Sequence, residues 1–259
     1  MSIKITTELV KKLRDATGIS VMQCKRALEE AEGDMNKALA ILKKTSGDIA
    51  LKKADRNAKD GAVAVKTENN KSVLVALHCE TDFVSRNEDF VSLLNNLTNL
   101  AFSSGIEKMK EASKDLIDPI IQKTGENIQL GDSFVVNGDI LGVYVHNNKK
   151  AVIVSLVGGN TELAKDIAMH ITAMKPEYIR KEEIPEEAKN TMNEIFQKEI
   201  ANIDKPEEIK KKMLEGKIST YFKEKTLLDQ PSIKNPDETI GKILEKAKAQ
   251  IKEVKSYSI

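Results

Sequence analysis

The chain has 259 residues, 40% of them hydrophobic and 31% charged, with a formal net charge of +1. This length is typical of about two domains, and the composition is that of an ordinary soluble protein. The balanced charge gives no basis for a nucleic-acid partner, and no apolar run approaches the roughly 18 residues that a membrane span needs. Cys24 and Cys79 are too few for a disulfide framework or a zinc site, so both are expected to be free thiols.

The first elements in chain order are helical. Residues 5–45 show the apolar spacing of three short helices. Thr7, Ser20 and Asp34 are the predicted N-caps. Met1 is followed almost directly by this pattern, which leaves no room for a signal or transit peptide. We therefore expect a cytoplasmic protein, favouring a bacterial one, although a mature organellar chain would look the same.

A doubled pattern follows the Lys- and Asp-rich stretch 47–60, which predicts a solvated helix or linker. "GAVAVKTENNKSVLVALHCETDF" begins at Gly61 and "GVYVHNNKKAVIVSLVGGN" begins at Gly142. Each reads as a strand, an Asn-Asn-Lys turn and a second strand, and each runs into an amphipathic helix. We predict two similar α+β halves, with an additional helix over about 107–123 in the first half.

The last third of the chain predicts mainly helices. Residues 186–228 are charged and helical, with a turn at Lys205-Pro206, which is typical of two antiparallel helices forming a hairpin. Its apolar stripe is wider than one helix-on-helix seam needs, so a homodimer through this hairpin is one interpretation. A last helix is predicted over Ile240–Val254.

These elements predict an α+β fold. It consists of a small three-helix, ubiquitin-associated-like amino-terminal module, a core of two similar α+β halves with antiparallel sheets, and a protruding helical hairpin. The predicted boundaries are 1–50 for the module, 51–140 for the first half, 141–184 with 229–259 for the second half, and 185–228 for the hairpin.

No pattern for catalysis or for a cofactor emerges. The chain lacks the glycine-rich phosphate-binding motifs and H-E-x-x-H, and its three histidines lie far apart in sequence. Cys79 follows His78, which suggests a thiol hydrolase as one alternative. Adjacent residues on a strand point to opposite faces, however, so the pair cannot work as nucleophile and base. We therefore expect no catalytic residue, metal or cofactor.

The stretch "HCETDFVSRNEDF", residues 78–90, places a charge beside a large ring on a connector. Ser85 and Glu88 fit a capping box for the following helix, which leaves Thr81–Val84 outside it. In one interpretation, Phe83 or Val84 folds back as a hydrophobic staple. In the other, Phe83 is partly exposed and wedges into a pocket of another protein, with Asp82 contacting polar groups there.

Several motifs in order resemble the elongation factor Ts family. "TDFVSRN" after "HCE" is similar to the family's T-D-F-V-[AS]-[KR]-N signature. The other matching segments are "LVKKLRDATGISVMQCKRALEEAEGDMNKA", "GENI", "DIAMHITAMKPEYI" and "KPEEIKKKMLEGKISTYFKEKTLLDQP". Family members often close with a V-G-E-G-type segment, which this sequence lacks, so the resemblance does not extend to contacts made by that tail.

The resemblance implies a nucleotide exchange factor that acts by binding. Its partner would be elongation factor Tu, in the GDP-bound and nucleotide-free states, with no direct contact to nucleic acid or membrane. Thr81, Asp82, Phe83 and Val84 would dislodge the Mg²⁺ that the partner holds. The further implied contacts are Arg14, Val21, Met22 and His146.

Some interpretations stay open at this point. Val21 and Met22 could equally be core residues, and His146 could be an ordinary turn residue. A competing interpretation of the whole chain is a ubiquitin-associated-like or nascent-chain-binding module fused to an unrelated α+β domain. That interpretation rests on the three-helix start alone and leaves the Thr81–Val84 signature unexplained.

Overall fold

The computed structural model describes residues 5–201, 203 and 205–259. The chain divides into two compact units, the first made of residues 1–135, 145–151 and 257–259 and the second of residues 136–144 and 152–256. Helices alternate with two small three-stranded antiparallel sheets. The predicted α+β class is therefore confirmed.

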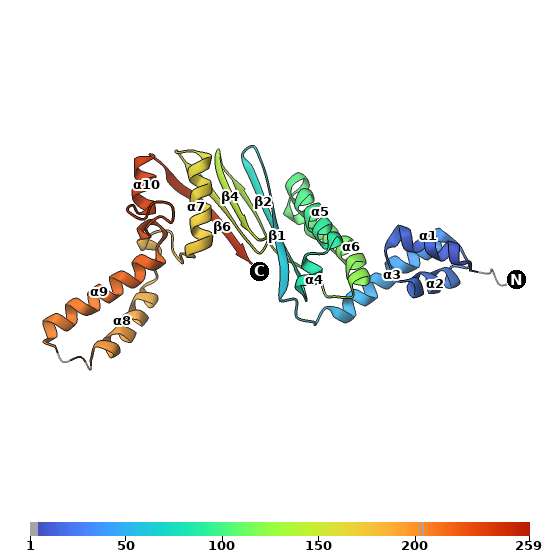
Figure 1. Cartoon of the computed structure of the whole chain (residues 1–259), viewed down its shortest axis with the longest axis horizontal. Coiled ribbons are helices and arrows are strands. Elements are labelled where there is room, and N and C mark those ends of the chain that lie inside the picture. Colours follow the sequence, from blue (N-terminus) through green and yellow to red (C-terminus); the bar gives the residue numbers. More distant parts are fainter. Residues whose placement is uncertain (1–4, 202, 204) are drawn as a thin grey trace. The chain divides into compact units, whose positions relative to one another are not determined.

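Three helices open the chain (Figure 1): α1 (Thr7–Thr17), α2 (Val21–Glu30) and α3 (Met35–Lys53). The Ser20 and Asp34 side chains cap α2 and α3 as predicted, by accepting bonds from backbone N–H groups of the first turn. The cap of α1 is Thr6 rather than Thr7, because the Thr6 hydroxyl accepts the Leu9 N–H. A small separate core holds these helices together, and its fully buried members include Leu13, Cys24 and Leu28.

The third helix is longer than the sequence predicts. It continues past residue 45 to Lys53 and takes in the first half of the stretch 47–60 that was expected to be a solvated helix or linker. Ser46 and Ala50 are buried on this extension, and Ala50 joins the core of the first sheet. The burial of this face against α6 (Ile106–Thr124) outweighs the cost of Gly47 inside the helix, which is about 1 kcal/mol.

The first sheet has the strand order β1 (Asp60–Glu68), β2 (Lys71–Cys79) and β3 (Gln129–Asn137). The hairpin register runs from Asp60 opposite Cys79 to Glu68 opposite Lys71, as the Asn-Asn turn predicts. Helix α5 (Glu88–Ser104) packs on this hairpin, and α6 packs on α5. Sequence patterning predicted α6 but not β3, whose residues are mostly half-buried and show no clear alternation.

The second sheet repeats this plan with β4 (Ile140–His146), β5 (Lys150–Val157) and β6 (Gln250–Ser258). Asn147 and Asn148 form the hairpin turn with φ of 50° and 55°, the positive values that a two-residue hairpin needs. Helix α7 (Thr161–Met174) buries Ile167 and Ala168 in the core of this sheet.

The predicted helix over 240–254 is wrong in its second part. Helix α10 (Ile240–Lys246) stops early, and Lys248 takes φ of 50°, which does not continue a helix. Residues 250–258 then form β6 beside the central strand β5. Ile251, Val254 and Tyr257 have helical spacing, but the unpaired edge of β5 offers this segment a full set of backbone hydrogen bonds.

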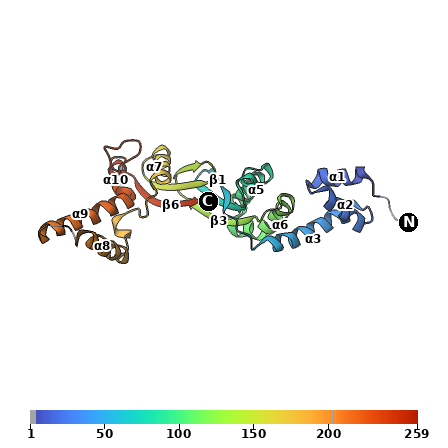
Figure 2. The same ribbon diagram turned by 60° about the horizontal axis from the view of Figure 1, so that its bottom comes forward.

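Two helices, α8 (Glu186–Ala201) and α9 (Glu207–Lys225), form the predicted hairpin (Figures 1 and 2). Phe196 and Tyr221 meet edge to face between them, with ring centroids 5.9 Å apart. The short turn Leu227–Asp229 follows, and its Leu227 is fully buried in the core of the second sheet. A homodimer through the hairpin stays a prediction.

Candidate functional site

A single turn of helix, α4 (Asp82–Ser85), lies between β2 and α5. The predicted capping box is wrong. Ser85 ends α4 and is buried, and its hydroxyl donates to the Asp82 carbonyl. The N-cap of α5 is Asn87, whose side chain accepts the Asp89 N–H. The capping pattern failed because the Ser85 hydroxyl bonds back to its own preceding turn, and Asn87, two residues further on, caps α5 instead.

Within α4, neighbouring side chains take opposite roles. Val84 is buried in the core of the first sheet, whereas Phe83 has 83% of its surface exposed. Val84 therefore does the packing that the staple interpretation required, and Phe83 does none of it. The exposure expected for a probing ring is confirmed. Asp82 is also accessible and forms an ion pair with Arg86 at 3.1 Å.

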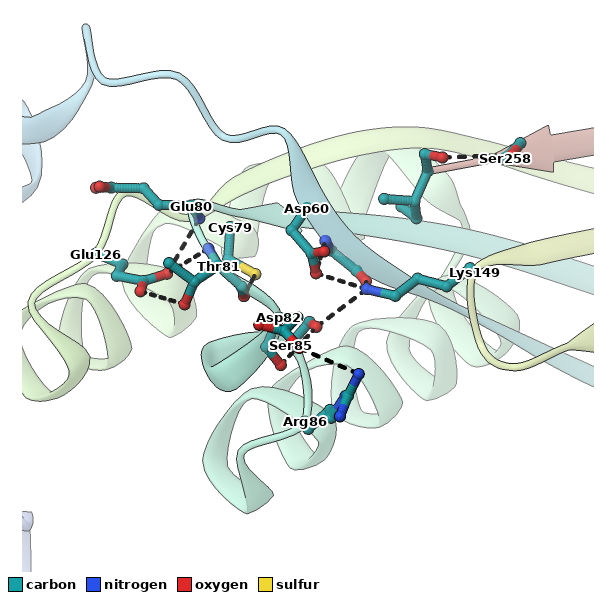
Figure 3. A network of polar contacts seen from close by, with 12 residues as sticks. Asp60, Cys79, Glu80, Thr81, Asp82, Ser85, Arg86, Glu126, Lys149 and Ser258 are labelled. Carbon is teal, nitrogen blue, oxygen red and sulfur yellow. Dashed lines mark hydrogen bonds and ion pairs between the residues drawn. The ribbon is translucent and has the colours of Figure 1, made fainter.

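Glu126, on the loop before β3, holds the start of this turn (Figure 3). One carboxylate oxygen accepts the N–H groups of Glu80 and Thr81, at 3.1 and 3.0 Å, and the other accepts the Thr81 hydroxyl at 2.6 Å. The contact is reciprocal, because the Glu80 carboxylate accepts the Asn127 N–H at 2.7 Å. The conformation of Thr81 is thus set by a residue 45 positions away.

Lys149, in the turn after β4, supports the same element at its other end (Figure 3). Its ammonium donates to the Asp60 carboxylate, the Gly61 carbonyl and the Ser85 hydroxyl, at 2.5, 2.6 and 3.1 Å. Burial raises the pKa of Asp60, but hydrogen bonds from Lys149 and the Gly61 N–H help to outweigh burial and hold that pKa below its ordinary value. Asp60 is therefore a fixed negative charge at neutral pH.

The geometry opposes a thiol nucleophile. Cys79 is fully buried, and its thiol donates to the Thr81 carbonyl. Burial, with the charges of Asp60 and Glu126, raises its pKa to about 12, so the thiolate that nucleophilic attack needs is absent at neutral pH. His78 instead shares a 2.7 Å hydrogen bond with the Tyr257 hydroxyl.

The other predicted contact residues lie on exposed positions. Arg14 is exposed near the end of α1, and Val21 and Met22, with 49% and 60% of their surface accessible, begin α2. The interpretation of Val21 and Met22 as core residues is therefore wrong for this chain. His146 is exposed where β4 meets its turn, three residues before Lys149. His170, by contrast, is buried and hydrogen-bonded to Gln230, as a packing histidine would be.

Sequence reasoning missed Glu126 and Lys149 as functional candidates. In the sequence, "GENI" stands out only as part of the family resemblance, and Lys149 only as a turn residue. Their partners lie 45 to 89 positions away, so no local pattern could reveal them. In the part of the chain that the structure describes, no three His, Cys, Asp or Glu side chains are grouped to hold a metal ion. The described helices also include none with the length and apolar character needed to cross a bilayer.

Known proteins of one family are similar to nearly the whole chain. A family model described as elongation factor TS matches residues 80–259. "Elongation factor Ts" of Hahella chejuensis is 40% identical over 98% of this chain and 92% of its own length. The same factor of Teredinibacter turnerae is 40% identical over 95% and 88%, and that of Marinobacter nauticus 39% identical over 94% and 86%. The chain is therefore a translation elongation factor. It belongs to the elongation factor Ts family.

Proposed function

We propose that this chain is the guanine-nucleotide exchange factor of elongation factor Tu in the bacterial cytoplasm. It promotes GDP release by binding the nucleotide-free partner more tightly than the GDP-bound partner. Because linkage is reciprocal, a factor with that preference lowers the affinity for GDP by the same ratio. The family membership supports this function, and the exposed ring of Phe83 is the observation that carries it.

In this proposal α4 acts on the metal ion of the partner. Mg²⁺ demands near-ideal octahedral geometry, so a small displacement of its ligands by an inserted side chain weakens its binding greatly. Phe83 supplies the inserted ring and Asp82 the polar contact, while Thr81, bonded to Glu126, and Val84, buried in the core, hold the turn in place. Full burial of a phenylalanine yields about 1.5–3 kcal/mol, which corresponds to roughly a ten- to hundredfold shift in GDP affinity.

We further propose that Arg14, Val21 and Met22 supply affinity rather than displacement of the metal ion. They lie on the amino-terminal helices, which have a core of their own. An exposed methionine suits an adaptable apolar contact. The double variant Val21→Ser/Met22→Ser should raise the concentration needed for half-maximal GDP release and leave the rate at saturation unchanged. A lower saturating rate with unchanged half-saturation would contradict this division.

The deciding experiment measures the release of labelled GDP from elongation factor Tu with and without this protein. We expect the chain to accelerate release in a manner that saturates with its concentration. Cys79→Ala is the control that separates exchange by binding from thiol chemistry, and it should release GDP like the wild type. No acceleration at any concentration would refute the proposed function.

A further inference from the structure

The orientation of Phe83 depends on contacts from outside its own helix. Helix α4 spans only Asp82–Ser85, and a single turn of helix has no stability in isolation because nucleation is unfavourable. Three anchors hold it: burial of Val84 in the core, the Glu126 carboxylate at Thr81, and the Lys149 ammonium at Ser85. The Lys149 anchor comes from the β4–β5 turn, which also carries His146.

The β4–β5 turn is itself fixed in place. The Asn148 carbonyl accepts the Val63 N–H of β1 at 2.8 Å, and the Lys149 carbonyl accepts the Ile259 N–H at 2.9 Å. The Lys149 N–H closes the turn on the His146 carbonyl at 2.9 Å. A lysine ammonium has three protons, and here they meet three acceptors, on Asp60, Gly61 and Ser85. The ammonium therefore has a defined position rather than a range of them.

From this geometry we propose that Lys149 is a positioning residue for nucleotide exchange. It ties the turn that carries His146 to the helix that carries Phe83, so that both elements meet the partner as one preorganised surface. This inference rests on the proposed function and adds a residue that touches neither the nucleotide nor the metal ion. Without the Lys149 contacts, α4 must become ordered when the partner binds. The free energy that this ordering costs is then not available to displace GDP.

The chain offers a matched control in Lys66. The side chains of Lys149 and Lys66 are 31% and 34% exposed, and each is paired with a carboxylate. Lys66 contacts Glu68 and Asn99, away from α4. Both Lys149→Met and Lys66→Met remove one ammonium from the first unit and keep an unbranched stem. They therefore differ chiefly in whether α4 loses an anchor.

The test measures GDP release from elongation factor Tu as a function of exchange-factor concentration. Lys149→Met should lower the rate at saturation about tenfold, the factor expected for one lost charge-assisted hydrogen bond, with less than about a twofold change in half-saturation. Lys66→Met should change neither quantity. Lys149→Arg, which keeps a cation within reach of Asp60, should recover a large part of the saturating rate. An unchanged saturating rate in Lys149→Met would overturn the proposal.

Two further measurements separate positioning from simple destabilisation. Lys149→Met leaves the Asp60 carboxylate without its cation, so Lys149→Met/Asp60→Asn should regain melting temperature while exchange stays slow. Full recovery of exchange in that double variant would assign the effect to the unpaired charge and refute positioning. Amide hydrogen exchange of residues 81–87 in the free protein should quicken in Lys149→Met and not in Lys66→Met. That readout needs no partner, so it shows whether Lys149 orders α4 even if the wild type releases no GDP.

Discussion

The two halves of the core differ at the connection between the β-hairpin and the helix that follows it. In the second half, β5 passes to α7 through Gly158, Gly159 and Asn160, with φ of 77° and 75° at the glycines and the Asn160 side chain capping the helix. In the first half, residues 80–87 make the same connection and include the extra turn α4. The same strand-to-helix step thus takes three residues in one half and eight in the other.

The difference in length between the two connections shows which part of the longer one the fold does not require. The second half shows that three residues suffice to lead the chain from the central strand to its helix. The longer connection is supported by two charged side chains, Glu126 and Lys149, and it presents a phenylalanine that is 83% exposed. Neither the extra turn nor its supports are needed for topology, which is why we place the function there.

The largest effect should come from the core of the first half. Phe90, seven residues after Phe83, is fully buried in the core of the first sheet. Phe90→Ala should lower the free energy of unfolding by about 3–5 kcal/mol, because it leaves a cavity as well as losing burial. Urea denaturation measures this directly. A loss below about 1 kcal/mol would mean that Phe90 is not a core residue and does not differ from Phe83 in its contribution to stability.

The next effect tests the short connection of the second half. At Gly158 φ is 77°, and an added Cβ would lie 2.3 Å from the Lys248 carbonyl oxygen. Gly158→Ala should therefore cost about 1–3 kcal/mol of stability in the same denaturation measurement.

Gly216 provides the control for that change, because it lies inside α9 with nothing within 4 Å of its added Cβ. Gly216→Ala should stabilise the chain by about 0.5–1 kcal/mol. Equal destabilisation by Gly158→Ala and Gly216→Ala would show that the tight backbone at Gly158 is not the cause of the lost stability.

The long connection should show the opposite behaviour, a large functional effect with a small effect on stability. Phe83→Ala should slow GDP release about tenfold or more and cost less than about 1.5 kcal/mol of stability, because the ring makes no core contact. Asp82→Ala should also slow release with little change in melting.

Val157→Ala supplies the matched control, since Val157 is an exposed apolar residue at the end of β5 in the second half. It should leave both melting and GDP release unchanged. If the Phe83→Ala protein is destabilised but releases GDP at the normal rate, Phe83 is a core residue and not a ring that contacts the partner.

The smallest expected effect is a loss of stability at low pH, which should come from a helix of the second half and not from its counterpart in the first. Helix α7 buries His170, whereas the buried residues of α5 include no ionisable side chain. Burial lowers the pKa of His170, and the Gln230 hydrogen bond opposes this only in part. The unfolded chain therefore binds the proton more readily, so the stability from the neutral ring is present above pH 6.5 and is lost as pH falls below it.

Melting temperatures at pH 7.5 and 5.5 test this asymmetry. The wild type should lose more stability on acidification than His170→Gln, which keeps a hydrogen-bonding side chain but cannot titrate. Equal slopes in the two proteins would show that the buried histidine does not contribute to acid sensitivity.

Local sequence determined the elements that are stabilised by neighbours along the chain. The Ser20 and Asp34 caps, the Asn147-Asn148 turn, α6 and the α8–α9 hairpin were all predicted, because capping, turn φ angles and helical periodicity involve residues a few positions apart. The signature around Phe83 also identified the family and the surface that carries the candidate function.

Tertiary structure decided the elements whose partners lie far away in sequence. Strand β6 formed where a helix was predicted, because the edge of β5 was open to it. The Ser85 hydroxyl, which the sequence assigned to a cap, instead accepts a hydrogen bond from Lys149, 64 positions away. The supports of α4 join residues 45 to 89 positions apart, and such contacts leave no periodic trace in a single sequence. The sequence thus pointed to the ring at Phe83, and only the folded chain showed what holds its helix in place.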